Sequence, residues 1–103
     1  MSRFDVVGFG ALNVDKLFKV NKLAKAEEER LIEDYAEACG GSAANTAIGL
    51  ARLGCKVGYI GKVGCDREGD LQSQDFCKEG IDVNGLIHAG QGKTGTVLGF
   101  VDK

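Results

Sequence analysis

A glycine pair followed by small residues constrains the fold of this chain more than any other feature. Residues 40–47 read Gly-Gly-Ser-Ala-Ala-Asn-Thr-Ala. Glycine reaches left-handed backbone angles, and the residues after it recur at helical spacing, with Gly54 as a stop. We predict a tight turn and then a helix over Ser42–Leu53, N-capped by Ser42. Its buried face is predicted to consist of Ala44, Ala47, Ile48 and Ala51.

Two apolar runs and a second helical pattern lie around this helix. Phe4–Phe9 is too short for three helical turns, and Lys56–Lys62 is rich in β-branched and aromatic residues, so both are predicted strands. The order strand, helix, strand with short connections predicts a right-handed βαβ unit. A helix over Arg67–Lys78, N-capped by Asp66 and ended by Gly80, has a thin apolar stripe and is expected at the periphery.

Three further segments have the pattern of strands. Leu12–Val20 separates apolar from polar residues, with Asn13 and Asp15 on its polar side. Val83–Ala89 and Thr94–Val101 are also strand-like. Leu12–Val20 therefore presents two faces of different chemistry.

The segment between the early strands is ambiguous. Lys22–Ile32 has the Ala, Glu, Lys and Leu content of a helix, whereas Leu31–Ala38 resembles a half-exposed strand. The charge run Glu27–Arg30 is expected to be a solvated surface.

Composition bounds the class of protein. The 103 residues carry a formal net charge of -2 with no Lys/Arg-rich run, so neither a nucleic acid nor a membrane is expected as a partner. No apolar stretch is long enough to cross a bilayer, and no signal-peptide pattern follows Met1, so a cytoplasmic location is expected. With 16 glycines and no proline, the chain reads as a single small domain with many tight turns.

The cysteines and the lone histidine do not have the spacing of a metal site, and no metal is expected. The sequence has no Cys-x-x-Cys pair, and His88 has no companion at ligand spacing and is expected at a strand end. The thiols are expected to be reduced and to pack as small hydrophobic groups. They belong to Cys39, Cys55, Cys65 and Cys77.

The glycine turn has the chemistry of a pocket floor. Gly40, Gly41 and Ser42 would bring bare backbone and helix N–H donors to a ligand, and the Asn45 amide suits a polyhydroxylated one. From these residues alone, an ordinary glycine turn with a capped helix is equally consistent. Asp15, taken alone, is more simply a surface carboxylate.

Two apparent phosphate motifs are rejected. Gly8-Phe9-Gly10 opens like a dinucleotide fingerprint, but Asn13 replaces the third glycine and a strand-like segment follows. Gly92-Lys93-Thr94 ends like a P-loop, yet Ile87 stands where the first glycine is required.

The glycine signature, with Gly54 and Gly64 beyond it, resembles the N-terminal motif of the PfkB or ribokinase-like carbohydrate kinases. The segments GFGALNVDKL, GKVGCDREGD and TGTVLGFVD extend this resemblance over the whole chain. The family often has a Pro-x-x-Gly-Glu turn where this chain reads LAKAEEER. The resemblance implies a partial, three-layer Rossmann-type α/β fold of βαβ units. Residues 1–103 would be one truncated domain, with a small β-lid near 12–38 and 94–103.

The same resemblance implies the N-terminal part of an ATP-dependent sugar or nucleoside kinase that phosphorylates a hydroxymethyl group. The residues it places on the acceptor substrate are Asn13, Asp15, Gly40, Gly41, Ser42 and Asn45. The family's catalytic aspartate lies in a Gly-Ala-Gly-Asp motif that this sequence lacks, so no catalytic residue is assigned. ATP and Mg²⁺ are therefore expected to serve the full-length enzyme. We expect this chain alone to bind ATP poorly and to be inactive.

An alternative class stays open, a non-catalytic binding or assembly module with the same fold. A short sheet leaves unpaired strand edges, which favour pairing with a second chain. A homodimer through lid strands or exposed sheet edges is expected to be possible in either case.

Overall fold

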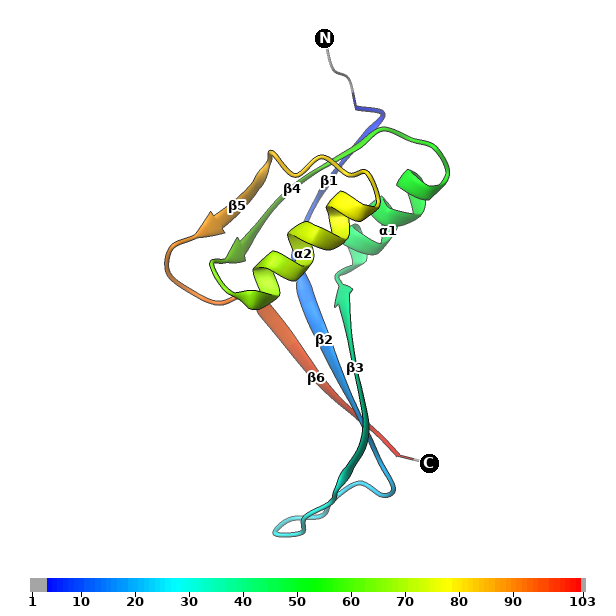
Figure 1. The fold of residues 1–103 in the computed structure, drawn as a ribbon, viewed down its shortest axis with the longest axis vertical. Helices are drawn as coiled ribbons and strands as arrows, with labels where there is room; N and C mark the ends of the chain where they lie inside the picture. Colours follow the sequence, from blue (N-terminus) through cyan, green and yellow to red (C-terminus); the bar gives the residue numbers. More distant parts are fainter. Residues whose placement is uncertain (1–3, 103) are drawn as a thin grey trace.

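Two separate sheets and two helices make up the described residues, 4–102, of a computed structural model (Figure 1). The elements in chain order are β1 (Val6–Phe9), β2 (Asn13–Val20), β3 (Ile32–Gly40), α1 (Ser42–Arg52), β4 (Val57–Gly64), α2 (Arg67–Lys78), β5 (Leu86–Ala89) and β6 (Gly95–Val101). One sheet has the strand order β1-β4-β5 and the other β3-β2-β6. The predicted α/β class is confirmed.

The β1-β4-β5 sheet is parallel and packs against both helices. Val6 of β1 pairs with Val57, and Gly61 of β4 pairs with Leu86. α2 connects two adjacent parallel strands, so β4-α2-β5 is a βαβ unit. α1 instead follows β3, which belongs to the other sheet, because the chain forms β2 and β3 between β1 and α1.

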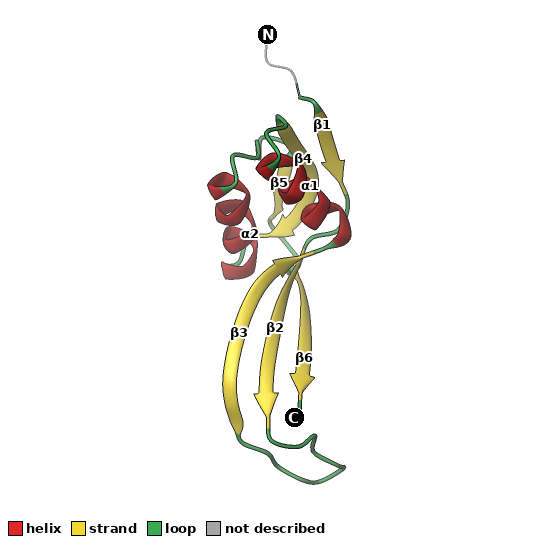
Figure 2. Cartoon of the chain, turned by 90° about the vertical axis from the view of Figure 1, so that its right-hand side faces the viewer, coloured by secondary structure: helices red, strands yellow, loops and turns green. Residues whose placement is uncertain are grey.

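The β3-β2-β6 sheet extends away from the helices, and we term it the lid sheet (Figure 2). β2 is its central strand, antiparallel to β3 and parallel to β6. The Phe18 ring lies between Tyr35 and Phe100, with ring centroids 5.0 Å and 5.3 Å away. Cross-strand aromatic pairs of this kind hold a small sheet together where it has little core beneath it.

The ambiguous segment before β3 is a loop. Its helical composition is overridden because β2 and β3 are antiparallel neighbours, so the residues between them must reverse the chain direction. Glu27 adopts a positive φ of 64°, and the Lys25 amide donates to the Glu28 carboxylate at 2.8 Å.

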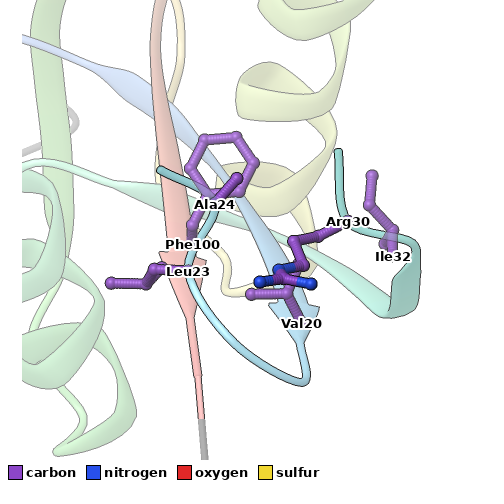
Figure 3. Close-up of a pocket in the computed structure, with 6 residues that line it drawn as sticks. All are labelled: Val20, Leu23, Ala24, Arg30, Ile32 and Phe100. Carbon is purple, nitrogen blue, oxygen red and sulfur yellow. The ribbon is translucent and has the colours of Figure 1, made fainter. Parts of the chain in front are cut away.

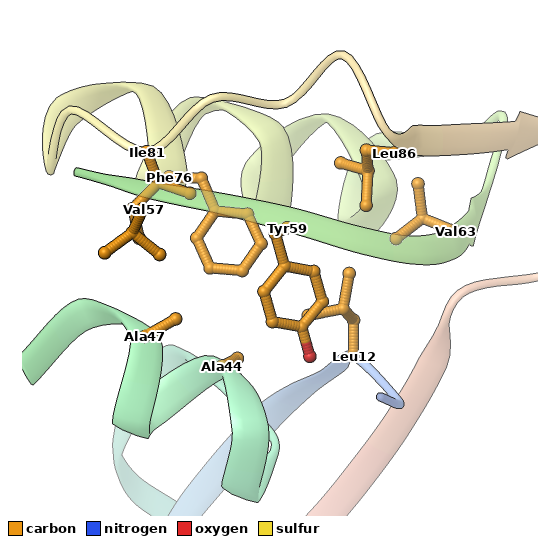
Figure 4. Packing of buried hydrophobic residues seen from close by; sticks show 9 residues of the cluster. All are labelled: Leu12, Ala44, Ala47, Val57, Tyr59, Val63, Phe76, Ile81 and Leu86. Carbon is orange, nitrogen blue, oxygen red and sulfur yellow. The ribbon is translucent and has the colours of Figure 1, made fainter. Parts of the chain in front are cut away.

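The core lies between the parallel sheet and the two helices (Figure 4). The rings of Tyr59 and Phe76 are both almost fully buried, with centroids 4.8 Å apart. α2 was expected to be peripheral, but Phe76 is 1% and Gln72 0% exposed, so that expectation is wrong. One large aromatic side chain gives α2 the burial that its sparse apolar stripe did not suggest.

The helix ends agree only in part with the sequence. Asp66 caps α2 by accepting from the Gly69 amide at 2.8 Å, and Gly80 follows this helix with a φ of 77°. The predicted Ser42 cap is wrong, because Gly41 is the N-cap of α1 and no side chain among the described residues accepts there. In the buried face of α1, Ala44 and Ala47 are buried, while Ile48 and Ala51 are partly buried against the core.

The four thiols do not all pack as hydrophobic groups. Cys39 and Cys55 are half-buried, but Cys65 and Cys77 are exposed, which corrects the expectation for those two. All four are free. His88 lies in the short strand β5 and is exposed, one residue from its end.

The second face of the parallel sheet is apolar and uncovered by the described residues. It presents Val7 and Phe9 of β1, Ile60 of β4 and Ile87 of β5, all exposed. A partial three-layer fold has this property, because only one helical layer is present. No helix within residues 4–102 combines the length and apolar character needed to span a bilayer.

Candidate substrate-binding site

Asn13 and Asp15 lie on one face of β2, where the adjacent strands carry glycine. Residues two apart on a strand share a face. Asn13 pairs with Gly40 on β3 and with Gly95 on β6. A Cβ at Gly40 would come to 2.7 Å from Asp15 Oδ2, and one at Gly95 would overlap Asn13 Oδ1. A carboxylate and an amide are thus set over bare backbone, and larger side chains on either flank would displace them.

The chain turns from β3 into α1 at Gly41. Its φ of 118° lies in the region that side-chain-bearing residues rarely adopt. A Cβ there would also come to 2.5 Å from the main-chain oxygen of Ala11. Glycine is therefore required at this position for the backbone itself, independently of any ligand.

The N-terminus of α1 has no side-chain cap, in contrast to α2. The first amides of a helix have no partner within it and carry partial positive charge, so an oxygen-rich ligand is a suitable acceptor. The main-chain N–H of Asn45 already donates to the Gly41 carbonyl at 2.9 Å. Ser42 and Asn45 are both exposed on the first turn of α1.

The predicted site residues are thus brought together to different degrees. Strand register and glycine contacts join Asn13, Asp15 and Gly40 directly, and Gly41 follows Gly40 in the turn. Ser42 lines a hollow of about 400 Å³ between β1 and α1. Ser42 and Asn45 are connected to Asp15 through the main chain of the turn and the start of α1.

A larger apolar hollow, of about 420 Å³, lies at the far end of the lid sheet (Figure 3). Apart from Arg30 its lining is apolar: Val20, Leu23, Ala24, Ile32 and Phe100. Val20 is five residues along β2 from Asp15, which is about 16 Å at the rise of a strand. With only one polar lining residue, this hollow does not suit a polyhydroxylated molecule, and we do not assign it to the site.

Cys39, next to Gly40, is not a nucleophile at neutral pH. Burial raises the pKa of its thiol to about 11, and the carboxylates of Asp75, Glu37 and Asp15 add to the effect. A protonated thiol neither attacks nor binds metal well. Among the described residues, no group of three or more His, Cys, Asp or Glu side chains is placed to hold a metal ion.

Several residues beside the site were not among the site residues predicted from the sequence. Gln72 of α2 is buried, and its Nε2 donates to the Asn13 carbonyl at 2.5 Å. Asp66 and Thr94 are hydrogen-bonded at the junction of the two sheets. The Asp-x-x-Gly and Thr-Gly motifs single out Asp66 and Thr94 in the sequence. Their contact, however, joins residues 28 positions apart, which no local pattern predicts.

The sequence matches the pfkB family of carbohydrate kinases over residues 3–103. It is 44% identical over 93 residues to the 5-dehydro-2-deoxygluconokinase of Clostridium perfringens, a match that covers 89% of this chain and 26% of that protein.

Solved structures agree. The nucleoside kinase of Methanocaldococcus jannaschii, an archaeal member of the ribokinase family, superimposes with a TM-score of 0.84 and 26% identity, over 95% of this chain and 33% of that one. An uncharacterized sugar kinase of Pyrococcus horikoshii in complex with ATP gives a TM-score of 0.74 and 28% identity, over 90% and 29%.

These superpositions define the class of fold, that of the ribokinase-like kinases. The chain belongs to the pfkB family of carbohydrate kinases. It spans between a quarter and a third of the length of these relatives.

Proposed function

We propose that this chain is the acceptor-binding part of an ATP-dependent sugar or nucleoside kinase, one that transfers the γ-phosphoryl group to a hydroxymethyl group. The acceptor would contact Asn13, Asp15, Gly40, Gly41, Ser42 and Asn45. The observation that carries this proposal is the flanking of Asp15 and Asn13 by Gly40 and Gly95. That arrangement leaves polar side chains accessible over bare backbone on both adjacent strands.

The proposed contacts match the chemistry of a polyol. An ionised carboxylate accepts hydrogen bonds from two hydroxyl groups, and an amide both donates and accepts. A substrate without those hydroxyls would leave desolvated groups unpaired, which disfavours its binding. Relatives named as sugar and nucleoside kinases support this class of acceptor.

The proposal gives the described residues no site for ATP and Mg²⁺, so no step of phosphoryl transfer is derived for them. Phosphoryl transfer depends on positioned charge around the phosphates. Thr94 ends the P-loop-like Gly92-Lys93-Thr94 and leads into β6. Its hydroxyl donates a hydrogen bond to Asp66. Binding of ATP and Mg²⁺ is assigned to other parts of the protein. The proposal includes that residues 1–103 alone transfer no phosphoryl group.

The acceptor site is tested by titrating the ¹⁵N-labelled chain with a panel of sugars and nucleosides. Shifts are expected at amides of residues 13–15 and 40–45, and Asp15→Asn should abolish them. Asp34→Asn is the matched control, because Asp34 is an exposed carboxylate farther along the same lid sheet. No response to any member of the panel, or an equal loss in both variants, would contradict the assignment.

A phosphotransfer assay with ATP, Mg²⁺ and the same panel tests the second part. Turnover by the 103-residue chain would show that it is catalytically complete. The alternative of a non-catalytic assembly module is not favoured, because the matched relatives are kinases.

We infer that a homodimer would form through the lid sheet. β3 and β6 are its edge strands, and each pairs with a neighbouring strand, β2, on one side. Tyr35, Leu98 and Phe100 are exposed on these strands. Sedimentation equilibrium tests the dimer, and Leu98→Lys should make the chain monomeric if the inference holds.

A further inference from the structure

The N-cap and first two turns of α2 contact two strands of the lid sheet and the residue that precedes the third. Asp66, the N-cap, is hydrogen-bonded to Thr94 just before β6. Gln72 is hydrogen-bonded to Asn13 of β2, and Arg67 forms an ion pair with Glu37 of β3. Figure 1 shows α2 beside the junction of the two sheets. One short stretch of helix thus connects to strands from three distant parts of the chain.

The connection to the residue before β6 is part-buried and consists of several hydrogen bonds. Asp66 Oδ2 accepts from the Thr94 amide at 2.9 Å, and its Oδ1 accepts from the Thr94 hydroxyl at 2.6 Å. That hydroxyl accepts in turn from the Gly64 amide at 2.9 Å, and Thr94 is 5% exposed. Gly69 lies so close to the Gly64 carbonyl that a Cβ would overlap it. The end of β4, the start of α2 and the residue before β6 are therefore joined by hydrogen bonds and close packing.

The connection to β2 reaches the candidate site itself. Gln72 is fully buried and donates to the main-chain carbonyl of Asn13. The side chain of Asn13 lies against Gly95 of β6. Holding the main chain at this residue fixes the point from which the Asn13 and Asp15 side chains project.

The connection to β3 is of a different kind, exposed and ionic. Arg67 donates to both carboxylate oxygens of Glu37, at 2.6 Å and 2.9 Å, and also contacts Glu68 at 3.2 Å. Glu68 lies 3.7 Å from Lys16 of β2. The Arg67 side chain is 62% exposed, so water competes for it. Glu37 precedes Ala38, which pairs with Asp15.

We propose that the start of α2 sets the orientation of the lid sheet, and with it the Gly40–Gly41 turn, relative to the β1-β4-β5 sheet. We term this segment, with its contacts to the lid sheet, the bracket. Asp66 and Thr94 are its permanent connection, and the Arg67–Glu37 pair is its adjustable one. Arg67 is a positioning residue for acceptor binding, although it contacts no acceptor. Only the effect on acceptor affinity rests on the proposed function. The effect on lid orientation does not.

The test compares two Arg–Glu ion pairs, each with two hydrogen bonds of similar length. Arg52 and Glu79 also form a two-bond pair, at 2.6 Å and 2.9 Å, with Arg52 68% exposed, but both residues lie on or beside the helices of the core. Arg67→Glu and Arg52→Glu thus each remove a two-bond Arg–Glu pair, one attached to the lid and one not, and Arg67→Glu also removes the contact with Glu68. Residual dipolar couplings of backbone amides, measured on the ¹⁵N-labelled chain in an alignment medium, report the orientation of the lid sheet relative to the β1-β4-β5 sheet.

Arg67→Glu is expected to change the relative orientation or widen its distribution, and Arg67→Glu with Glu37→Arg to restore it. Acceptor affinity should fall about two- to fivefold in the single variant and recover in the double one. Arg52→Glu should leave orientation and affinity unchanged. Couplings unaltered by Arg67→Glu, or altered equally by Arg52→Glu, would overturn the bracket. If the wild type binds no acceptor, the proposed function fails, while the couplings still decide the bracket.

Discussion

Asp15 and Gly40 lie on adjacent strands so close together that one methyl group at Gly40 would reach 2.7 Å from the Asp15 carboxylate. The group it would meet is the free end of a flexible side chain. Gly41, one residue later, would instead meet the main chain of Ala11, at a φ of 118°. Neighbouring glycines are thus required for different reasons, the first for the candidate site and the second for the backbone.

Alanine substitutions should separate those reasons. Gly40→Ala is expected to keep most of the stability, because Asp15 moves aside, but to lose acceptor binding. Gly41→Ala should cost at least about 1–3 kcal/mol of unfolding free energy, measured in urea. Gly49→Ala in α1 is the control, since the space around Gly49 is open, and it should stabilise by about 0.5–1 kcal/mol. Equal losses at Gly40 and Gly41 would refute the distinction.

Phe76 should be a principal contributor to stability. Phe76→Ala leaves a cavity beside Tyr59 and is expected to cost about 3–5 kcal/mol in chemical denaturation. Phe9→Ala removes the same side chain where it is 78% exposed, and should change stability by less than about 0.5 kcal/mol. A small effect of Phe76→Ala would instead support the peripheral position of α2 that its sequence indicates.

Gln72 should tolerate a neutral replacement better than a charged one. Gln72→Met keeps the volume and loses the hydrogen bond to Asn13, and the loss is softened because Gln72 Oε1 has no partner within the described residues. Gln72→Glu places a carboxyl group in a fully buried position, where ionisation is disfavoured. Its destabilisation should therefore grow as the pH rises above the ordinary carboxylate range. Thermal unfolding across pH 4–8 measures this growth, which Gln72→Met should not show.

Acid should weaken the bracket through Glu37. Hydrogen bonds from Arg67 and then Tyr35 lower the pKa of Glu37 from 4.5 to about 2. A lowered pKa means that its stabilisation is complete above pH 4.5 and is lost as the pH falls toward 2. Glu37→Gln should remove this part of the acid dependence in unfolding experiments. Asp66, whose pKa is lowered mainly by Thr94, titrates in both proteins and cancels in the difference. Parallel curves for the two proteins would contradict the expectation.

The thiols should react in an order set by exposure. Cys65 and Cys77 are exposed, whereas burial raises the pKa of Cys39 to about 11. Alkylation at pH 7.5, followed by peptide mass spectrometry, should modify the exposed pair first and Cys39 far more slowly. Preferential modification of Cys39 would place it in a different environment.

Local patterns predicted most of the elements. The polar and apolar sides of Leu12–Val20 identified β2 and placed Asn13 and Asp15 on one face, because alternation is a property of the strand itself. The small residues after Gly41 identified α1. Asp66 could be predicted as a cap because capping is a local interaction: its hydrogen bond to Gly69 spans three residues.

The remaining features depend on contacts between distant segments. The Lys22–Ile32 composition favours a helix, yet the pairing of β2 with β3 decides its conformation. Ser42 has the side chain of a cap, but Gly41 takes the N-cap position with its positive φ. The attachment of α2 to the lid sheet depends on contacts with residues of β2 and β3 and with Thr94, and the place of Gly95 beside Asn13 arises only when β6 joins β2. No local pattern contains that information.

The parallel pairing of β6 with β2 also has a consequence for the order of folding. Asn13 and Gly95 are partners although they are 82 positions apart in the sequence. Contacts this distant form slowly, since a large loop must close first, whereas the neighbouring strands β2 and β3 meet early. A ribosome-bound chain that has not yet emerged past Gly95 has one flank of the proposed pocket missing. The proposed acceptor site would therefore be completed late in the synthesis of this segment.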